Sequence, residues 1–336
     1  MSHTGVESKP PWRAVPLAVR LRVEETLGTK VRRATRAWGG YAPSRTYRLS
    51  LANGQRAFVK ANSQVPGQGA GHALAREERF YRELGGMIAP WLPIFYGSFR
   101  HDSWHVLLLE DLGPKSVPPW TLAKARGVAH AYAEFHQATL GKALPEWLPR
   151  QRYVRFTLPW ELVAEESDDL REVAALAGTQ AADAQRWLQA ALPALGEAGD
   201  LAARLDPPHV LLHLDTRSDN LRWAKGCLRL FDWPFAAVGP AELDAATFVQ
   251  GVAAEGGPAP EQIIAWYGEC VPLRPDILRA AVATLAAFFA DVSWRPDLPE
   301  LPRLRSIQRR QFCASLAWAA RCLRLPEPTW LNSVSR

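Results

Sequence analysis

One segment, residues 209–233, constrains the fold more than any other part of this sequence. It reads HVLLHLDTRSDNLRWAKGCLRLFDW, and the apolar run near its start predicts a buried strand. Its second half predicts a β-hairpin, with short strands at 221–223 and 227–231 joined by an Ala-Lys-Gly turn. Because a hairpin returns the chain to where it began, we expect Asp232 to lie near Asn220.

Three oxygen-bearing side chains should therefore gather at one rim, namely Asp215, Asn220 and Asp232. An Asn carbonyl and an Asp carboxylate are hard oxygen ligands, which suit a magnesium ion that also holds substrate phosphates. A second carboxylate that is not committed to the metal could accept a proton from an attacking hydroxyl. The alternative is a chance spacing on a buried strand, with Asp232 as a helix cap. The downstream aspartate at hairpin distance disfavours that alternative.

The pattern His213-x-Asp215-x-x-x-x-Asn220, followed by Asp232-Trp233, resembles the aminoglycoside phosphotransferase and choline kinase branch of the protein-kinase-like fold. The resemblance covers roughly residues 30–250. It implies a two-lobed α+β fold, with a small N-lobe of antiparallel sheet plus helix and a larger, mostly helical C-lobe. It also implies ATP or GTP and Mg²⁺ as cofactors, Asp215 as the catalytic residue, and Asn220 and Asp232 as metal ligands.

Lys60 draws notice because the chain holds only seven lysines. It ends a predicted strand at 56–60, which follows the strong hairpin turn Asn53-Gly54. The glycines of the loop Gly39–Ser44 could let backbone N–H groups approach phosphates, although an ordinary turn would have the same sequence. By the resemblance, Lys60 is the lysine that neutralises the α- and β-phosphates.

Residues 70–84 predict a helix that could supply a partner for Lys60. Glu77 shares the inward face of this helix, but helical spacing alone does not separate it from Glu78. The resemblance favours Glu77, which stands seven residues before the helix-ending Leu84. Either glutamate could instead pair with an arginine of its own helix.

A predicted strand from residue 104 ends in Glu110-Asp111-Leu112-Gly113 and resembles the family's hinge between the lobes. The resemblance places adenine on the backbone groups around Glu110 and Leu112. The Pro-rich stretch that follows marks the expected domain boundary. It gives a nucleotide-binding lobe at 1–113 and a helical, catalytic and acceptor-binding lobe at 114–336.

The second lobe is expected to be mostly helical, with helices at 122–139, within 160–205, and at 241–255, 260–269, 275–291 and 303–324. His136 is interpreted as a packed core histidine. The acidic residues between Glu161 and Asp169 are interpreted as a solvated helix face. The resemblance gives Asp244 a structural role in fixing the catalytic loop, and His213 most simply braces the same loop.

Three residues depart from the family's usual pattern. Leu214 stands where the family often has Gly, and Pro234 follows Asp232-Trp233 where an acidic residue is common. Arg217 replaces the His that antibiotic-modifying members usually carry. These departures argue against an aminoglycoside acceptor without touching the phosphoryl-transfer core. Arg217 could add positive charge near the γ-phosphate or pair with Asp219, and we favour the salt bridge.

The formal net charge of +6 raises the question of a nucleic-acid partner. The arginines are spread along the chain, so we expect no nucleic-acid binding. The sequence contains no apolar run of membrane-spanning length and no signal-peptide core at its start, which predicts no membrane association. Four scattered cysteines fit a reducing cytoplasm.

The sequence thus predicts a kinase that transfers the γ-phosphoryl group of ATP or GTP to a hydroxyl of a small molecule. Only nine residues, 233–241, separate Asp232 from Glu242, which is too short for the activation segment of a protein kinase. A nucleotide-binding pseudokinase is the alternative, and the joint presence of Lys60, Asp215, Asn220 and Asp232 argues against it. A basic helical nucleic-acid binder is a further alternative that rests on charge alone.

Overall fold

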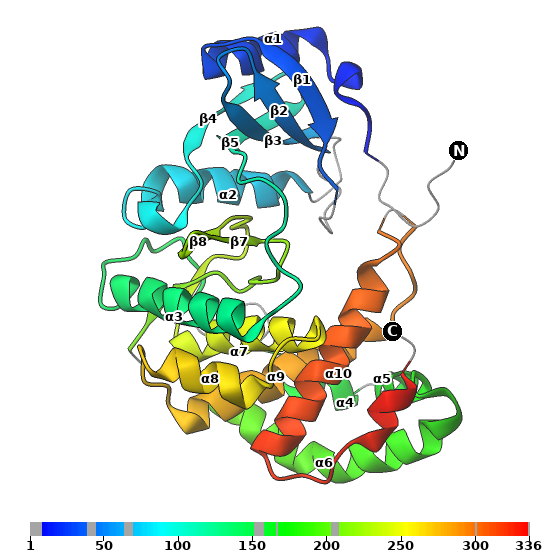
Figure 1. Cartoon of the computed structure of the whole chain (residues 1–336). Helices are drawn as coiled ribbons and strands as arrows, with labels where there is room; N and C mark the ends of the chain where they lie inside the picture. The colour runs from blue at the N-terminus through cyan, green and yellow to red at the C-terminus, as the bar shows by residue number, and fades with distance from the viewer. Residues whose placement is uncertain are drawn as a thin grey trace. The chain divides into compact units, whose positions relative to one another are not determined.

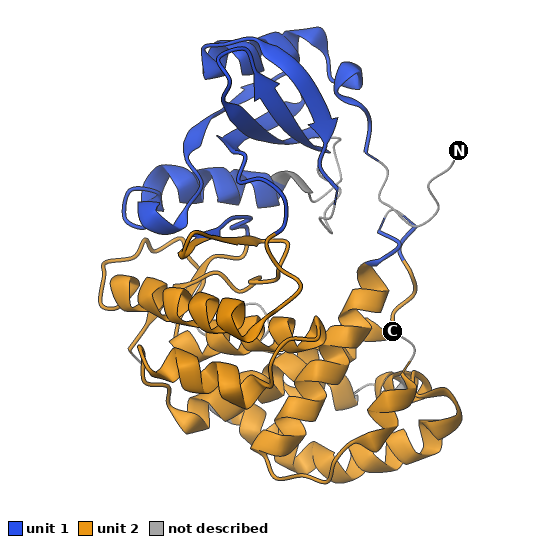
Figure 2. Ribbon diagram, viewed as in Figure 1, with its two compact units in different colours: residues 1–115, 229–234, 298–303 blue, residues 116–228, 235–297, 304–336 orange. Residues whose placement is uncertain are grey.

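The computed structural model describes residues 9–38, 45–63, 70–150, 158–165, 167–202, 208–299 and 301–334. The chain divides into two compact units, coloured blue and orange in Figure 2. Unit 1 is formed by Met1–Lys115, Arg229–Pro234 and Leu298–Arg303, and unit 2 by Ser116–Leu228, Phe235–Asp297 and Leu304–Arg336. The expected glycine loop Gly39–Ser44 lies outside the described residues.

Unit 1 is built on a five-stranded antiparallel sheet in the order β1-β2-β3-β5-β4. The strands are β1 (Val31–Arg36), β2 (Arg45–Leu51), β3 (Arg56–Ser63), β4 (Phe95–His101) and β5 (Trp104–Glu110). Helices α1 (Leu17–Leu27) and α2 (Ala70–Leu84) accompany the sheet, together with short 3-10 turns at Trp12–Ala14 and Ala89–Trp91 (Figure 1). Gly54 supplies the left-handed φ of +84° in the turn between β2 and β3.

The side chains of β3 divide between the two faces of this sheet. Val59 and Ala61 lie in an apolar core that also holds Val19 and Val23 of α1. Successive side chains of a strand point to opposite faces, so Lys60 lies on the other face. Helix α2 contacts β3, and its Glu77 pairs with Lys60, so α2 covers the side of the sheet that carries Lys60.

Unit 2 is mostly helical, as the α+β prediction requires. Its helices are α3 (Leu122–Thr139), α4 (Trp160–Glu165), α5 (Ser167–Ala175), α6 (Ala181–Ala202), α7 (Ala241–Ala254), α8 (Pro260–Gly268), α9 (Pro275–Ser293) and α10 (Leu304–Cys322), with 3-10 turns at Gly178–Gln180 and Thr329–Ser333. Strand β6 (Val210–Leu212) pairs with β9 (Ala237–Gly239), and β7 (Leu221–Ala224) pairs with β8 (Cys227–Leu230). None of the helices in the described parts of the chain is both long and apolar enough to span a bilayer.

Part of the acidic stretch at 161–169 is not a solvated face. Glu161 is exposed as expected, but Asp169 on α5 is 8% exposed and therefore buried. Where the sequence predicts long helices over 160–205, the structure has the short helices α4 and α5 and the long helix α6. Breaks between short helices allow a polar residue such as Asp169 to turn inward, which helical periodicity does not reveal.

Helices α7 and α9 are buried over most of their surface. Every residue of α7 from Ala241 to Val252 is buried, and α9 packs against both α7 and α10 (Figure 1). A helix buried on all faces must bring partners for its polar side chains. Glu242 pairs with Arg274, with Nε and Oε1 3.0 Å apart, and Asp244 binds the backbone of the loop that follows β6.

Candidate active site

The loop after β6 is held by the buried carboxylate of Asp244. Its two oxygens accept the backbone N–H groups of His213 and Leu214, each at 2.6 Å. Leu214 has a left-handed φ of +61°, which costs a non-glycine residue about 1–2 kcal/mol. The two hydrogen bonds to Asp244 offset this cost, so a leucine can occupy the position where the family often has glycine. His213 Nδ1 accepts the N–H of Asp215 at 3.2 Å and so braces the loop.

A buried polar network surrounds Asp244. His136 on α3 is fully buried, with Nε2 3.0 Å from Asp244 Oδ2 and Nδ1 bonded to the hydroxyl of Tyr267. Tyr132 bonds Thr216 Oγ1 in the loop at 2.6 Å. Burial alone would raise the pKa of Asp244, but the hydrogen bond and charge of His136 outweigh it and lower that pKa. The carboxylate therefore stays ionised and keeps both backbone bonds.

The carboxylate of Asp215 is gripped at both oxygens. Arg217 Nη1 donates to Oδ1 at 2.7 Å, and Asn220 Nδ2 donates to Oδ2 at 2.9 Å. The Asp215 side chain is 9% exposed, so it lies close to the surface without being freely solvated. Each oxygen accepts one of these bonds, and a carboxylate oxygen can in general accept more than one hydrogen bond.

Asn220 is oriented by the same residue. Its amide nitrogen donates to both the side chain and the backbone carbonyl of Asp215, each at 2.9 Å. Its Oδ1 accepts no hydrogen bond from the described residues. A hard amide oxygen in that position suits a cation such as Mg²⁺.

A second group of predicted site residues comes together in unit 1. Lys60 Nζ lies 2.6 Å from Glu77 Oε2 and 2.5 Å from Asp232 Oδ1. Burial alone would lower the pKa of Lys60, but the charges of Asp232 and Glu77 outweigh it and raise that pKa. Burial, together with the charge of Asp232, raises the pKa of Glu77 to about 7 despite the contact with Lys60. Lys60, whose side chain is 12% exposed, therefore stays charged.

Asp232 is positioned by its neighbour Trp233. The indole of Trp233 stacks on Phe80 of α2, with ring centroids 4.1 Å apart, and its backbone N–H donates to Glu77. Asp232 itself has a left-handed φ of +67°, which is uncommon for residues other than glycine, although aspartate adopts it more often than most. Strained backbone of this kind often marks functional positions.

Glu78, the other candidate partner of Lys60, is engaged elsewhere. It bonds Arg82 of its own helix at 3.0 Å, Ser98 at 2.5 Å and His105 at 2.7 Å. In this structure Glu77 pairs with Lys60 and Glu78 fastens α2 to β4 and β5.

We predict that protonation of His105 at acidic pH lowers the stability of unit 1. Its side chain is 1% exposed, and Nδ1 has no hydrogen-bond partner among the described residues. Burial and the charge of Arg100 lower the pKa of His105 despite the contact with Glu78. Because the pKa of His105 is lower in the folded than in the unfolded protein, its contribution to the free energy of unfolding is fully present above the ordinary pKa of about 6.5. That contribution is lost as the pH falls from there through the lower pKa of the folded protein.

The test compares thermal unfolding midpoints at pH 7.5 and pH 5.5. His105→Gln removes the titrating ring, so this variant should lose less stability on acidification than the wild type. His101→Gln, at the exposed end of β4, is the matched control and should behave as the wild type. Equal acid sensitivity of all three proteins would contradict the role of His105.

The predicted hinge is anchored by Asp111, a residue to which the sequence pattern assigns no role. Asp111 pairs with Arg48 at 2.5 Å and Arg56 at 2.9 Å, and accepts the N–H of Gly113 at 3.0 Å. The backbone N–H of Glu110 donates to the carbonyl of Ile94, and the Glu110 carboxylate accepts the N–H of Ile94. The backbone groups of Leu112 bond none of the described residues, so they are available to a ligand.

One supporting residue, Tyr132, could have been found from the sequence. Tyr132 stands four residues before His136, so both lie on one face of α3. From that face Tyr132 bonds Thr216 of the loop, and His136 bonds Asp244. The contact of Arg217 with Asp215 had no such signal, because it depends on the conformation of a six-residue loop.

Residues 33–283 match the family model described as the phosphotransferase enzyme family (APH). The match spans most of the chain and includes every residue assigned above to the two groups. This chain belongs to that family. The predicted family and the phosphotransferase activity are confirmed, and a comparison with curated proteins finds no match.

Several solved structures share the fold of this chain. A spectinomycin phosphotransferase has a TM-score of 0.57 at 14% identity, with coverage of 94% of this chain and 97% of the other. A choline kinase from Streptococcus pneumoniae has a TM-score of 0.54 at 15% identity, covering 89% and 98%. A macrolide 2'-phosphotransferase from Brachybacterium faecium has a TM-score of 0.52 at 17% identity, covering 93% and 98%. The two-lobed kinase-like fold is thereby confirmed.

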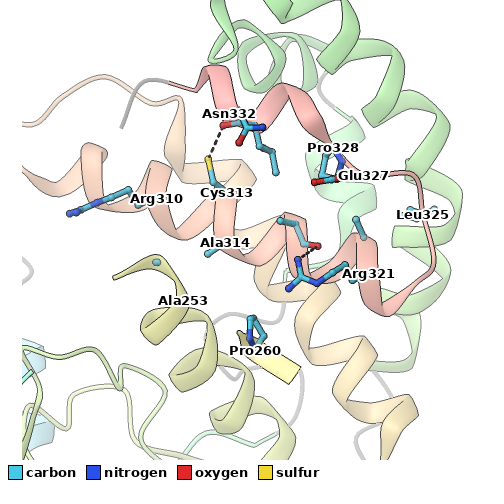
Figure 3. A pocket seen from close by; sticks show the side chains of 14 residues that line it. Ala253, Pro260, Arg310, Cys313, Ala314, Arg321, Leu325, Glu327, Pro328 and Asn332 are labelled. Atoms are coloured by element: carbon cyan, nitrogen blue, oxygen red, sulfur yellow. Dashed lines mark hydrogen bonds between the residues drawn. The ribbon is translucent and has the colours of Figure 1, made fainter. Parts of the chain in front are cut away.

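A separate hollow of about 510 Å³ lies within unit 2 between the end of α7, α10 and the C-terminal segment (Figure 3). Its walls are largely alanine, proline and leucine. On one side Arg321 pairs with Glu261, with Nε and Oε1 2.8 Å apart, and on another Cys313 contacts the carbonyl of Leu331. None of the residues that line it belongs to the groups around Asp215 or Lys60.

Proposed function

We propose that this phosphotransferase moves the γ-phosphoryl group of ATP or GTP to a hydroxyl group of a small molecule. The observation that carries the proposal is the carboxylate of Asp215, held at both oxygens by Arg217 and Asn220. It stands at the end of a buried strand, in a loop whose backbone is fixed by Asp244. A carboxylate held in this way is suited to receive a proton.

In the proposed reaction Asp215 orients the acceptor hydroxyl and takes up its proton. The acceptor oxygen forms a bond to the γ-phosphorus while the bond from that phosphorus to the bridging oxygen breaks. The electron pair leaves with the nucleoside diphosphate. The transition state of phosphoryl transfer is loose, so the protein contributes mainly placement and charge neutralisation.

Lys60, set by Glu77, is proposed to neutralise the α- and β-phosphates. Asn220 and Asp232 are the proposed Mg²⁺ ligands, since both offer hard oxygens. When bound, the ion would offset negative charge on the phosphate oxygens. No cluster of three His, Cys, Asp or Glu side chains that could hold a metal occurs in the described parts of the chain. Two protein ligands suffice for an ion that keeps water and phosphate oxygens around it.

We assign adenine to the backbone around Glu110 and Leu112, where Leu112 leaves its backbone groups unbonded among the described residues. In this assignment residues 1–113 bind the nucleotide, and residues 114–336 carry Asp215 and the acceptor site. The nine residues 233–241 leave no room for a peptide platform, which favours a small acceptor. All four cysteines are free thiols, in keeping with a cytoplasmic enzyme.

Nucleotide binding should appear as thermal stabilisation. A ligand that binds only the folded state raises the melting temperature by mass action, so ATP with Mg²⁺ should do so here. Lys60→Ala and Asp232→Ala should each shrink that increase, because one removes a phosphate partner and the other a metal ligand. Lys30→Ala is the matched control, since Lys30 is 75% exposed on the same unit, and should keep the full increase. Wild-type increases in both site variants would place the nucleotide elsewhere.

The proposed function is tested by nucleoside diphosphate release from ATP and GTP in the presence of a panel of hydroxylated metabolites and antibiotics. We expect one chemical class of acceptor to stimulate release by the wild type but not by Asp215→Asn. Phosphorylation of generic proteins without any small-molecule turnover would contradict the proposal.

A further inference from the structure

The guanidinium group of Arg217 lies between two carboxylates of its own loop. Nη1 is 2.7 Å from Asp215 Oδ1, while Nε and Nη2 reach the two oxygens of Asp219 at 3.0 and 3.3 Å. The three side chains are 21%, 9% and 8% exposed for Arg217, Asp215 and Asp219. The sequence favoured the pair with Asp219; the bond to Asp215 was not anticipated.

The backbone of the loop brings these side chains together. The N–H of Arg217 donates to the carbonyl of Asp215, and the N–H of Asn220 donates to the carbonyl of Arg217, each at 2.9 Å. These two short-range bonds turn the chain tightly enough for one arginine to reach aspartates on both sides of it. Without Arg217, the two nearly buried carboxylates of this loop would lose the positive charge that offsets their negative charges.

The two contacts of Arg217 have different geometry. Toward Asp219 the planar guanidinium presents a fork of two N–H groups, which fixes the plane of the group. With that plane fixed, the remaining nitrogen Nη1 is aimed at Asp215 Oδ1. A lysine carries a compact point charge and cannot make the fork and the third contact together.

Hydrogen bonds therefore hold the Asp215 carboxylate at both of its oxygens. Arg217 holds Oδ1 and Asn220 holds Oδ2, so rotation of the carboxylate would break at least one bond. Catalysis by a placed group depends steeply on its position, and a displacement of about 1 Å can cost roughly a hundredfold in rate. Removing one of these two hydrogen bonds should thus lower the rate of the chemical step more than it lowers the affinity for ATP.

We propose that Arg217, held by Asp219, is a positioning residue that fixes the orientation in which Asp215 receives the acceptor's proton. This inference rests on the proposed function of Asp215. The competing role is direct contact of Arg217 with the transferred phosphoryl group. The two roles differ in one respect: a positioning residue acts through Asp215, whereas a phosphate contact acts without it.

A double-mutant cycle separates the two roles. The probe is single-turnover hydrolysis of ATP with Mg²⁺, in which water takes the place of the acceptor hydroxyl, measured in the wild type, Arg217→Gln, Asp215→Asn and the double variant. Arg217→Gln should lower the rate about 10- to 100-fold in the wild-type background, and change it little in the Asp215→Asn background. The KM for ATP should stay near the wild-type value.

Two further variants guard against a merely structural effect. Asp219→Asn leaves Asp215 and Arg217 in place but weakens the fork, so it should lower the rate less than Arg217→Gln does. Arg217→Lys keeps the charge and should recover only part of the rate. Melting temperatures measured on the same preparations show whether any loss follows the folded fraction instead of the chemical step.

The proposal is overturned if Arg217→Gln has the same fold-effect in both backgrounds, if it leaves the rate unchanged, or if the loss matches the unfolded fraction. A wild-type chain that transfers phosphate to neither water nor any acceptor of the panel, or an Asp215→Asn variant at the wild-type rate, would contradict the proposed function itself. Those two results are distinct from any failure that concerns Arg217 alone.

Discussion

Asp215→Asn is expected to lower phosphoryl transfer by about a hundred- to ten-thousand-fold, the usual contribution of a general base. Asparagine keeps the size of the side chain and an oxygen that can accept the bond from Arg217. It removes the carboxylate that receives the acceptor's proton. Affinity for ATP should change little, because Asp215 is not assigned to the metal or the phosphates.

Single-turnover rates and ATP affinity should be measured on one preparation together with the melting temperature. Asp183→Asn, on the exposed surface of α6, is the matched control and should transfer phosphate at the wild-type rate. A structural carboxylate at position 215 gives the opposite profile, namely a lowered melting temperature with activity lost only in proportion to the folded protein. A well-folded Asp215→Asn enzyme with near wild-type turnover would exclude the assigned mechanism.

Asp244→Ala is expected to be the most destabilising single change in the loop region. Asp244 is fully buried and accepts hydrogen bonds from two backbone N–H groups and from His136. A buried donor that loses its acceptor costs about 1–3 kcal/mol, and Asp244→Ala leaves three buried donors without their acceptor. We therefore expect unit 2 to lose at least about 3 kcal/mol, with Leu214 no longer held at its left-handed φ.

Urea unfolding followed by tryptophan fluorescence measures this loss for Asp244→Ala. The control is Asp291→Asn, which breaks an ion pair with Arg295 at the surface of α9. Exposed pairs of that kind contribute about 0–1 kcal/mol, so the control should unfold close to the wild-type midpoint. An Asp244→Ala midpoint as high as that of the control would show that the loop is held by other contacts.

Much of this arrangement could be predicted because short-range patterns determine it. The hairpin at 221–231, the strand that carries Lys60 and the helix that carries Glu77 follow from alternation, turn residues and helical periodicity. These patterns did not decide between Glu77 and Glu78 as the partner of Lys60. Both face the same general direction on a helix, and only the rotation of α2 against β3 decides which one meets Lys60.

Other features depend on long-range contacts that leave no local signal. The φ of Leu214 is set by Asp244, 30 residues later in the chain, and the network behind it requires Tyr267 from α8. Asp111 locks the predicted hinge through arginines of β2 and β3. In each case a buried carboxylate needed partners, and the fold determined which groups could reach it.

Transfer of a labelled phosphoryl group tests the central claim most directly. The enzyme is incubated with γ-³²P-labelled ATP, Mg²⁺ and the acceptor panel, and the products are separated into small molecules, free phosphate and protein. We predict label in a phosphorylated small molecule with the wild type, and a loss of that product by about a hundredfold or more with Asp215→Asn. Label that reaches only water or protein, or a product that Asp215→Asn forms equally fast, would contradict the claim.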